Sequence, residues 1–260
     1  TNTIFTSDPG SRRITTQGGA LTRIGSNNEN GFDGQTLTVT TRDPETGQVT
    51  DETVGPIMPN TPAREIADRL GNADGVETTA YTETRLTGFN VDSAELMVTV
   101  GGETSTLNIA GSLDADSLEQ AIEDSDSFAA LDLSVINDGE GVTLRDDTGR
   151  DISVNLVSGM PTGTPPSDPI SVEKINPYDE SVAPASVSLT VGNDATVGGV
   201  VDAKLDDGVR VTASNPTFTM TPGNILTPTP PPPAAGDGTV FNSAPISESN
   251  YKGFQFEISG

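Results

Sequence analysis

Hydrophobic residues alternate with polar ones before a turn-rich stretch near residue 45, and two valines follow on the other side of it. Leu37 and Val39 alternate with threonines, the sequence DPETGQ follows, and Val49 and Val54 lie on the return. Alternation with a period of two places Leu37 and Val39 on one face of a strand, and Pro, Asp and Gly between two such segments favour a turn. The pattern therefore predicts a β-hairpin.

A helical period follows this hairpin, in the sequence PNTPAREIADRLGNADGV. We expect Thr61 as the N-cap, Pro62 as the first helical residue and Gly71 as the C-cap. The sequence GVETTAYTETRLTGFNV then returns to strand character. One apolar helix face is predicted from residues spaced at i, i+3, i+4 and i+7: Ala63, Ile66, Ala67 and Leu70.

The same order of patterns then repeats. AELMVTVGGETSTLNIAG predicts a hairpin turned by Gly101 and Gly102, and Ser117 with Gln120 predicts a capping box at the start of a short helix. Three short strands are expected after it, separated by the turns NDGEG and DDTGR. The buried stripe of this second helix is predicted to be Leu118, Ala121 and Ile122.

The spacing of corresponding positions indicates an internal duplication. Ile66 and Ile122 lie 56 positions apart, and Leu37 and Leu96 lie 59 apart. A two-turn helix is marginal alone in water, so each helix needs an antiparallel sheet on which to pack. The predicted fold class is α+β and all-β: small antiparallel-sheet domains with one short helix each, a duplicated ββαββ unit, followed by an all-β domain.

Composition shifts give the predicted domain boundaries. The Pro/Gly-rich MPTGTPPSDP is expected to be loop-like, and TPTPPPPAAGDG is expected to be a stiff polyproline spacer. The predicted segments are an extended β-rich segment at 1–30, a first hairpin-helix-strand module at 31–92, a second such module at 93–159, a Pro/Gly-rich connection at 160–184, and a β-rich domain at 185–260 with the spacer at 227–233.

The negative net charge argues against two classes of binding partner. The chain has 13 basic and 38 acidic residues and a formal net charge of −25. Binding to phosphate backbones or anionic lipid requires a cationic surface, so we expect neither nucleic acid nor membrane as a partner. There are no cysteines and therefore no disulfides, and no apolar run is long enough to span a bilayer. Because the chain begins with Thr1, we expect a fragment or a processed piece.

The residue types argue against catalysis. The chain has no histidine, the usual base of a nucleophilic triad. Two Ser-x-x-Lys matches occur, Ser171–Lys174 and Ser249–Lys252, but the companion motifs S-D-N and K-T-G are absent. Paired carboxylates arise by chance among so many acidic residues, and aromatic residues that could stack on sugars make up only 4%. We therefore predict no enzyme, and no catalytic, cofactor-binding or metal-binding residues.

Calcium is the best of the metal candidates. Hard oxygen ligands gather in the turns Asn137–Gly141, Arg145–Asp151 and Leu205–Gly208. None has the spacing of an EF-hand loop, and Asp, Asn and Gly are also ordinary turn residues. Turn chemistry is the favoured interpretation.

The second repeat resembles the flagellin hook IN module of bacterial flagellar axial proteins. The resemblance rests on the hairpin VTVGGETSTLNI, the helix DADSLEQAIED and the ending DDTGRDISV (Asp146–Val154), which is similar to the family's t-G-x-x-I-x-V pattern. The first repeat is similar in its helix and following strand but lacks that ending. YKGFQFEISG is similar to the strand with which hook-associated proteins re-enter their inner domain. The resemblance covers most of residues 31–158 and 185–260.

This resemblance implies a non-catalytic structural protein outside the cell, on the bacterial flagellum. It implies the surface-exposed outer domains of a hook–filament junction protein or of a flagellin, two alternatives that stay open. Its partners would be neighbouring subunits of the axial assembly, contacted through terminal heptad-rich segments that this chain lacks. The alternative is a set of tandem β-rich binding domains of a cell-surface adhesin, stabilised by calcium in the turns named above.

Overall fold

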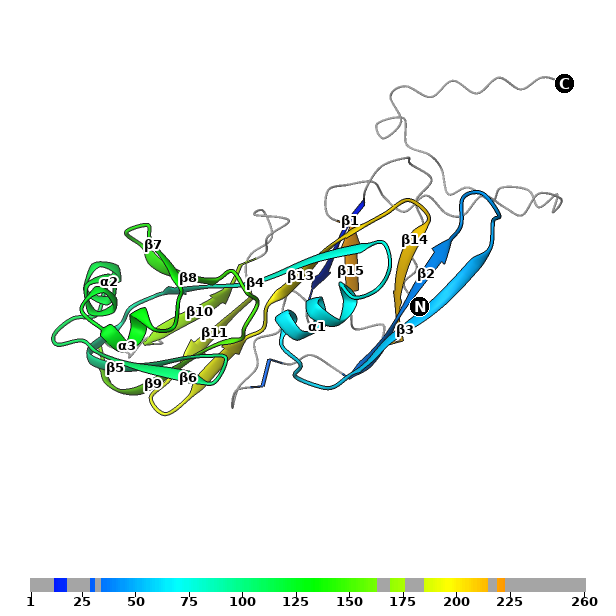
Figure 1. Ribbon diagram of the computed structural model, residues 1–260. Coiled ribbons are helices and arrows are strands. Elements are labelled where there is room, and N and C mark those ends of the chain that lie inside the picture. Colours follow the sequence, from blue (N-terminus) through cyan, green and yellow to red (C-terminus); the bar gives the residue numbers. More distant parts are fainter. Residues whose placement is uncertain are drawn as a thin grey trace, which may run out of the picture. The chain divides into compact units, whose positions relative to one another are not determined.

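The computed structural model describes residues 12–17, 29–30, 34–162, 169–175, 185–214 and 219–222 (Figure 1). Every strand pairing in this part of the chain is antiparallel, and the helices are short. The strands form an eight-stranded sheet, a four-stranded sheet of order β12-β9-β5-β6 and a three-stranded sheet of order β14-β2-β3. The predicted fold class is confirmed.

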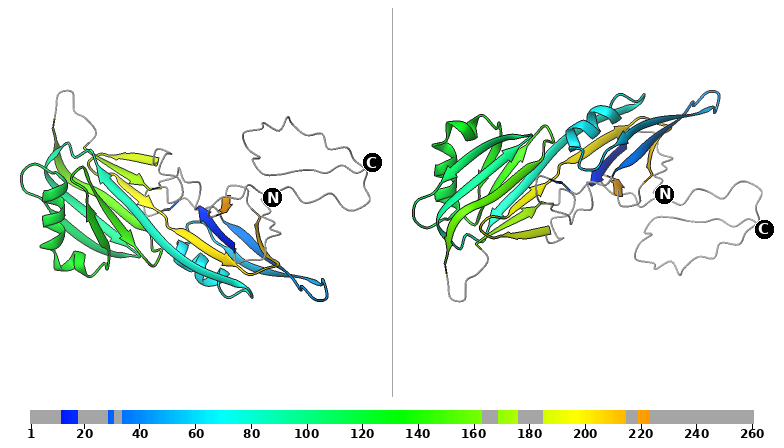
Figure 2. Two further views of the ribbon diagram at one scale, coloured as in Figure 1. Left: turned by 90° about the horizontal axis from the view of Figure 1, so that it is seen from above. Right: turned by 90° about the horizontal axis from the view of Figure 1, so that it is seen from below.

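The first repeat folds in the predicted order. A hairpin of β2 (Gln35–Arg42) and β3 (Val49–Ile57) precedes α1 (Ala63–Leu70) and the long strand β4 (Val76–Thr87). Both views of Figure 2 show α1, in cyan, beside β4, and the two elements are in contact. The predicted apolar helix face is confirmed, because all four of its residues are buried.

The predicted start of α1 is wrong by one residue. Pro62 is the N-cap, with extended backbone at φ −61° and ψ 150°, and it makes no side-chain cap. Thr61 does not cap the helix because its Oγ1 donates to the carbonyl of Met58 at 2.7 Å. Gly71 is the C-cap as predicted, and its N–H donates to the Ala67 carbonyl.

The second repeat contains the predicted hairpin, helix and three strands. The Gly101–Gly102 turn has positive φ at both residues, 59° and 95°, as a tight hairpin turn requires. Its elements are β5 (Val91–Val100), β6 (Glu103–Asn108), α2 (Ala115–Glu123), a further short helix α3 (Asp126–Ala129), β7 (Ser134–Asn137), β8 (Gly141–Asp146) and β9 (Ile152–Pro161).

The capping box of α2 lies three residues before the predicted one. Asp114 is the N-cap: its Oδ1 accepts from Ser117 N at 2.7 Å, and Ser117 Oγ accepts from Asp114 N at 2.9 Å. Ser117 is therefore the third helical residue and not the cap, because the Asp114 carboxylate accepts the hydrogen bond of the free N–H group at Ser117. In the predicted stripe, Leu118 and Ile122 are buried, whereas Ala121 is partly buried.

The remaining described elements are all strands. They are β1 (Arg12–Gln17), β10 (Ile170–Lys174), β11 (Ala185–Leu189), β12 (Asp194–Val197), β13 (Val200–Leu205), β14 (Val209–Ala213) and β15 (Thr219–Pro222). The expectation of a loop throughout 160–184 is wrong for 170–174, which form a strand of the eight-stranded sheet with Ile170, Val172 and Lys174 buried. The spacer at 227–233, the strand predicted near the C-terminus and the Ser249–Lys252 motif lie outside the described residues.

Strand β4 links two hydrophobic cores. Its first half, Val76–Tyr81, pairs with β13, and its second half, Thr82–Thr87, pairs with β8. One core gathers apolar residues of α1, the β2–β3 hairpin, β13 and β14, and the other gathers those of α2, α3, β5, β6, β8 and β9 to β12. The eight-stranded sheet thus contains strands from several predicted segments. The boundaries near 92, 159 and 184 stay predictions.

Candidate functional site

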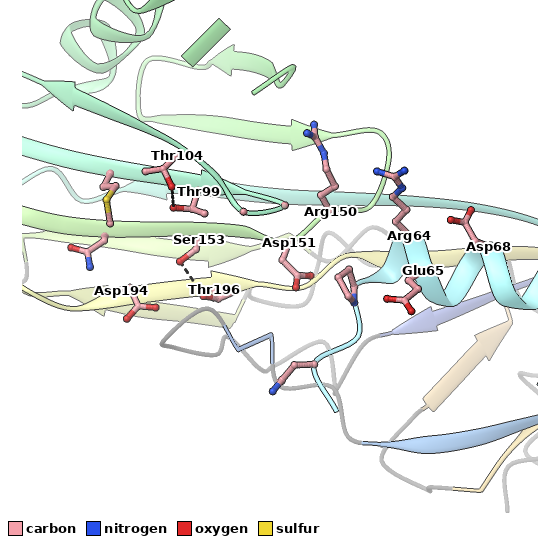
Figure 3. A pocket seen from close by; sticks show the side chains of 16 residues that line it. Arg64, Glu65, Asp68, Thr99, Thr104, Arg150, Asp151, Ser153, Asp194 and Thr196 are labelled. Atoms are coloured by element: carbon pink, nitrogen blue, oxygen red, sulfur yellow. Dashed lines mark hydrogen bonds between the residues drawn. The ribbon is translucent and has the colours of Figure 1, made fainter. Parts of the chain in front are cut away.

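A pocket of about 1050 Å³ lies beside the start of α1 (Figure 3). Its walls come from that helix, from the Gly101–Gly102 turn, from the loop before β9 and from β12. Its charged side chains have both signs: Arg64, Glu65, Asp68, Arg150, Asp151 and Asp194.

The hydroxyl groups of this pocket pair with one another. Thr99 and Thr104 share a hydrogen bond of 3.0 Å across the β5–β6 hairpin, and Thr196 Oγ1 donates to Ser153 Oγ at 3.1 Å (Figure 3). Ser153 therefore takes part in a contact between β9 and β12. These contacts join strands of the four-stranded sheet.

One wall of the pocket is the loop of the motif Asp146–Val154. The carboxylate of Asp146 is fully buried and accepts from Thr148 Oγ1 at 2.8 Å and from Arg150 N at 2.6 Å. Arg150 Nη2 donates to Asp146 Oδ1 at 2.8 Å and to the Leu131 carbonyl at 2.7 Å. Hydrogen bonds to a buried charge are the strong ones. The loop is thus closed by its own first carboxylate.

The glycine of this motif meets the first turn of α1. Gly149 has φ +79°, and its carbonyl accepts from Arg64 N at 3.0 Å. That N–H is one of the first four of the helix, which have no partner inside the helix. A Cβ at Gly149 would lie 2.5 Å from Ala80 Cβ. Glycine is therefore required here by both its backbone angle and its surroundings.

Behind this loop lies a polar cluster that we call the Asn30–Asp151–Lys174 cluster, in which Asp151 is partly buried and also lines the pocket. Asn30 and Lys174 are each 2% exposed. Asn30 Nδ2 donates to Asp151 Oδ2 at 2.9 Å, and also to the carbonyls of Asn60 and Thr61 at 3.3 Å each. The other carboxylate oxygen, Asp151 Oδ1, is buried, and the backbone of Gly199 also acts to lower the pKa of this carboxyl group.

Burial shifts the acid–base equilibria of both ionisable groups in this cluster. It raises the pKa of Asp151 to about 6, although the Asn30 hydrogen bond and the charge of Lys174 act in the opposite direction. It lowers the pKa of Lys174 to about 8, against the opposing effect of the Asp151 charge. Both shifts favour the uncharged form of the group, as desolvation does in general.

The sequence prediction missed this cluster. Ser171–Lys174 was considered only as a Ser-x-x-Lys match, and on strand β10 those two residues point to opposite faces, so the structure does not assemble a dyad. The available signal was the alternation itself. Ile170, Val172 and Lys174 share one face, so a lysine takes a position that the pattern gives to an apolar residue.

Two of the turns predicted as calcium candidates, Asn137–Gly141 and Arg145–Asp151, use carboxylates in hydrogen bonds. Asp138 Oδ1 accepts from Glu140 N at 3.0 Å and from Gly141 N at 2.8 Å, and its Oδ2 lies 2.7 Å from Arg85 Nη2. These backbone hydrogen bonds, together with Arg85, lower the pKa of Asp138. In the part of the chain that the structure describes, no three acidic side chains are grouped so that they could hold a metal ion.

Comparison with known proteins gives no sequence match and a weak structural similarity. No family model and no curated protein matches the sequence. Among solved structures, the crystal structure of the flagellar cap protein FliD from Helicobacter pylori is similar at 13% identity and a TM-score of 0.21, over 84% of this chain and 81% of that one. A TM-score this low does not establish a shared fold. No described helix is long and apolar enough to cross a membrane.

Proposed function

We propose that this chain is a non-catalytic structural protein of the bacterial flagellum, forming surface-exposed outer domains of a hook–filament junction protein or a flagellin. The observation that supports the proposal is the part that the motif Asp146–Val154 plays in the fold. This is the stretch most similar to the flagellar module, and its polar residues hold the chain together.

Each feature of that motif has a mechanical use. Asp146 closes the loop, Gly149 joins it to α1, and Ile152 and Val154 enter the core. A domain displayed on a filament has to resist shear, and buried charge-assisted hydrogen bonds together with close packing provide that resistance. A motif used in this way favours a structural role.

The neighbouring pocket supports the same proposal. Its hydroxyls are hydrogen-bonded in pairs across strands, and Arg150 is engaged with Asp146 and a backbone carbonyl. An activated nucleophile requires a base within hydrogen-bond reach. Ser153 instead accepts a hydrogen bond from another hydroxyl, that of Thr196.

Immunogold labelling tests this proposal. Antibody raised against the 260-residue chain would be applied to intact cells that produce the protein. We expect label on flagella; label along the whole filament would identify a flagellin, and a single band near the hook would identify a junction protein. Label on the cell body beside bare flagella would overturn the proposal and favour the adhesin.

A further inference from the structure

The Asn30–Asp151–Lys174 cluster has a composition that packing alone does not explain. Lys174 lies on the inward face of β10, where Ile170 and Val172 are fully buried. A lysine is almost never fully buried unless it is paired, because desolvation of an ammonium is costly. A third apolar side chain would complete this face without that cost. Packing alone therefore does not explain why a lysine occupies this position, and this points to a chemical role of its amine.

The three groups are an amine, a carboxamide and a carboxyl group. Asp151 contacts the carboxamide directly, since its Oδ2 lies 2.9 Å from Asn30 Nδ2. The carbonyls of Asn60 and Thr61 hold the same nitrogen and fix the orientation of the amide. Asp151 also interacts electrostatically with Lys174. The Asp151 carboxyl group thus interacts with both the Asn30 carboxamide and the Lys174 amine.

We propose that Lys174 and Asn30 form an intramolecular isopeptide bond, with Asp151 as the proton shuttle. Lys174 Nζ attacks the side-chain Cγ of Asn30 and forms a new C–N bond. Asp151 takes the proton that Nζ gives up and delivers it to Nδ2. The bond between Cγ and Nδ2 breaks and ammonia leaves. No oxidant, reductant or further reactant is needed, and the product is a secondary amide between the two side chains.

The electrostatics of the cluster suit this reaction. An amine is a nucleophile only when it is uncharged, and a proton shuttle works best when its pKa lies near the ambient pH. Burial lowers the pKa of Lys174 to about 8 and raises that of Asp151 to about 6. Asn30 and Lys174 are both buried, which keeps out the water that would compete with the amine for the carboxamide. The amine and the carboxamide belong to one folded chain, so their reaction is intramolecular and needs no encounter of two molecules.

The bond would tie two distant parts of the chain. Asn30 precedes the β2–β3 hairpin, whereas Lys174 ends β10, which pairs with β4. A covalent link across so long a loop restricts the unfolded chain in the way a disulfide does. A chain without cysteines would obtain a covalent cross-link by another chemistry. This inference is independent of the proposed function, because it concerns the chain itself.

Mass spectrometry of the full chain under denaturing conditions tests the proposal. We expect an intact mass lower than the sequence mass by one ammonia. Trypsin does not cleave after an acylated lysine, so the digest should contain peptide 24–42 joined to an uncut peptide 151–204. Lys174→Arg keeps the positive charge but removes the primary amine, so it should have its full mass. Asp151→Asn should also have its full mass, because the shuttle is lost.

Three results would overturn the proposal. The first is a wild-type chain of unchanged mass. The second is a loss of ammonia that persists in Lys174→Arg, which would indicate a succinimide at the Asn30–Gly31 dipeptide. The third is a loss of one water with Lys174 joined to Asp151. Because the wild-type result is read on the denatured chain, the test does not depend on whether a variant folds.

Discussion

The carbonyl of Gly149 accepts a hydrogen bond of 3.0 Å from the backbone N–H of Arg64. This contact joins the loop before β9 to the first turn of α1, and so connects the second repeat to the first. The backbone of Gly149 has φ +79°, and Ala80 lies against it. Two repeats that share one sheet through β4 are therefore also joined through a loop and a helix end.

Gly149→Ala should destabilise the protein strongly. The added Cβ would lie 2.5 Å from Ala80 Cβ and 3.0 Å from Arg64 N. We expect a loss of about 2–4 kcal/mol in the free energy of unfolding, of which ~1 comes from the backbone angle and the rest from overlap. Chemical denaturation monitored by circular dichroism measures it. Gly139→Ala is the matched control, with φ +84° and open space around the new Cβ. Equal losses in both variants would contradict the role of the contact.

Asp146→Ala should be among the most damaging single substitutions in the second repeat. It leaves Arg150, whose side chain is 20% exposed, without its carboxylate, and it frees the N–H of Arg150. Removing one partner of a buried pair costs about 3–5 kcal/mol. Asp147→Ala is the control, because Asp147 is 65% exposed and pairs with Arg145 at the surface. We expect the control to change the unfolding free energy by less than about 1 kcal/mol.

Sequence patterns predicted the elements of this fold well where a period was continuous. The stripe Ala63–Leu70 and the Gly101–Gly102 turn are local features, so their neighbours in sequence determine them. The cap of α2 was misplaced because Asp114 and Ser117 are both good caps, and only the three-dimensional contact decides between them. The alternation along β10 marks Lys174 as an inward-facing lysine, but its partners could not be predicted, because Asn30 and Asp151 lie outside the strands and far from Lys174 in the sequence.

Calcium should leave the thermal stability of the chain unchanged. The turn carboxylate of Asp138 is already used by two backbone N–H groups and by Arg85. Melting in millimolar calcium chloride should match melting in sodium chloride of equal ionic strength. This control is necessary because salt screens the self-repulsion of a chain of net charge −25. A midpoint several degrees higher in calcium alone would reveal a bound ion and favour the adhesin.

The first repeat should not fold by itself. In the intact chain, β4 pairs with β13 over its first half and with β8 and β10 over its second, and these strands lie outside residues 31–92. The core on α1 also contains Val201 and Val211 from β13 and β14. We expect peptide 31–92 to lack dispersed amide signals in NMR spectra. Peptide 1–229, which contains every described element, is the control and should retain them. A folded 31–92 would support the predicted boundary at residue 92.

As long as its amine is free, Lys174 should hold down the pKa of Asp151. Burial raises that pKa from 3.8 to about 6, and the lysine charge opposes the rise. Lys174→Met should therefore give an Asp151 that titrates at a higher pH than about 6, measured by carboxyl-detected NMR and assigned with Asp151→Asn. Acylation of Lys174 in the isopeptide bond removes the same charge, so a cross-linked wild type and Lys174→Met should titrate alike.

The same shift has a consequence for stability. Below pH 3.8 Asp151 is protonated in both the folded and the unfolded chain and costs nothing. As the pH rises through about 6, the unfolded chain has already released the proton that the folded chain retains, so Asp151 lowers the folding stability over this window. Unfolding free energies of wild type and Asp151→Asn should therefore diverge between these pH values, with the variant gaining relative to the wild type. A constant difference across the window would show that Asp151 is not desolvated.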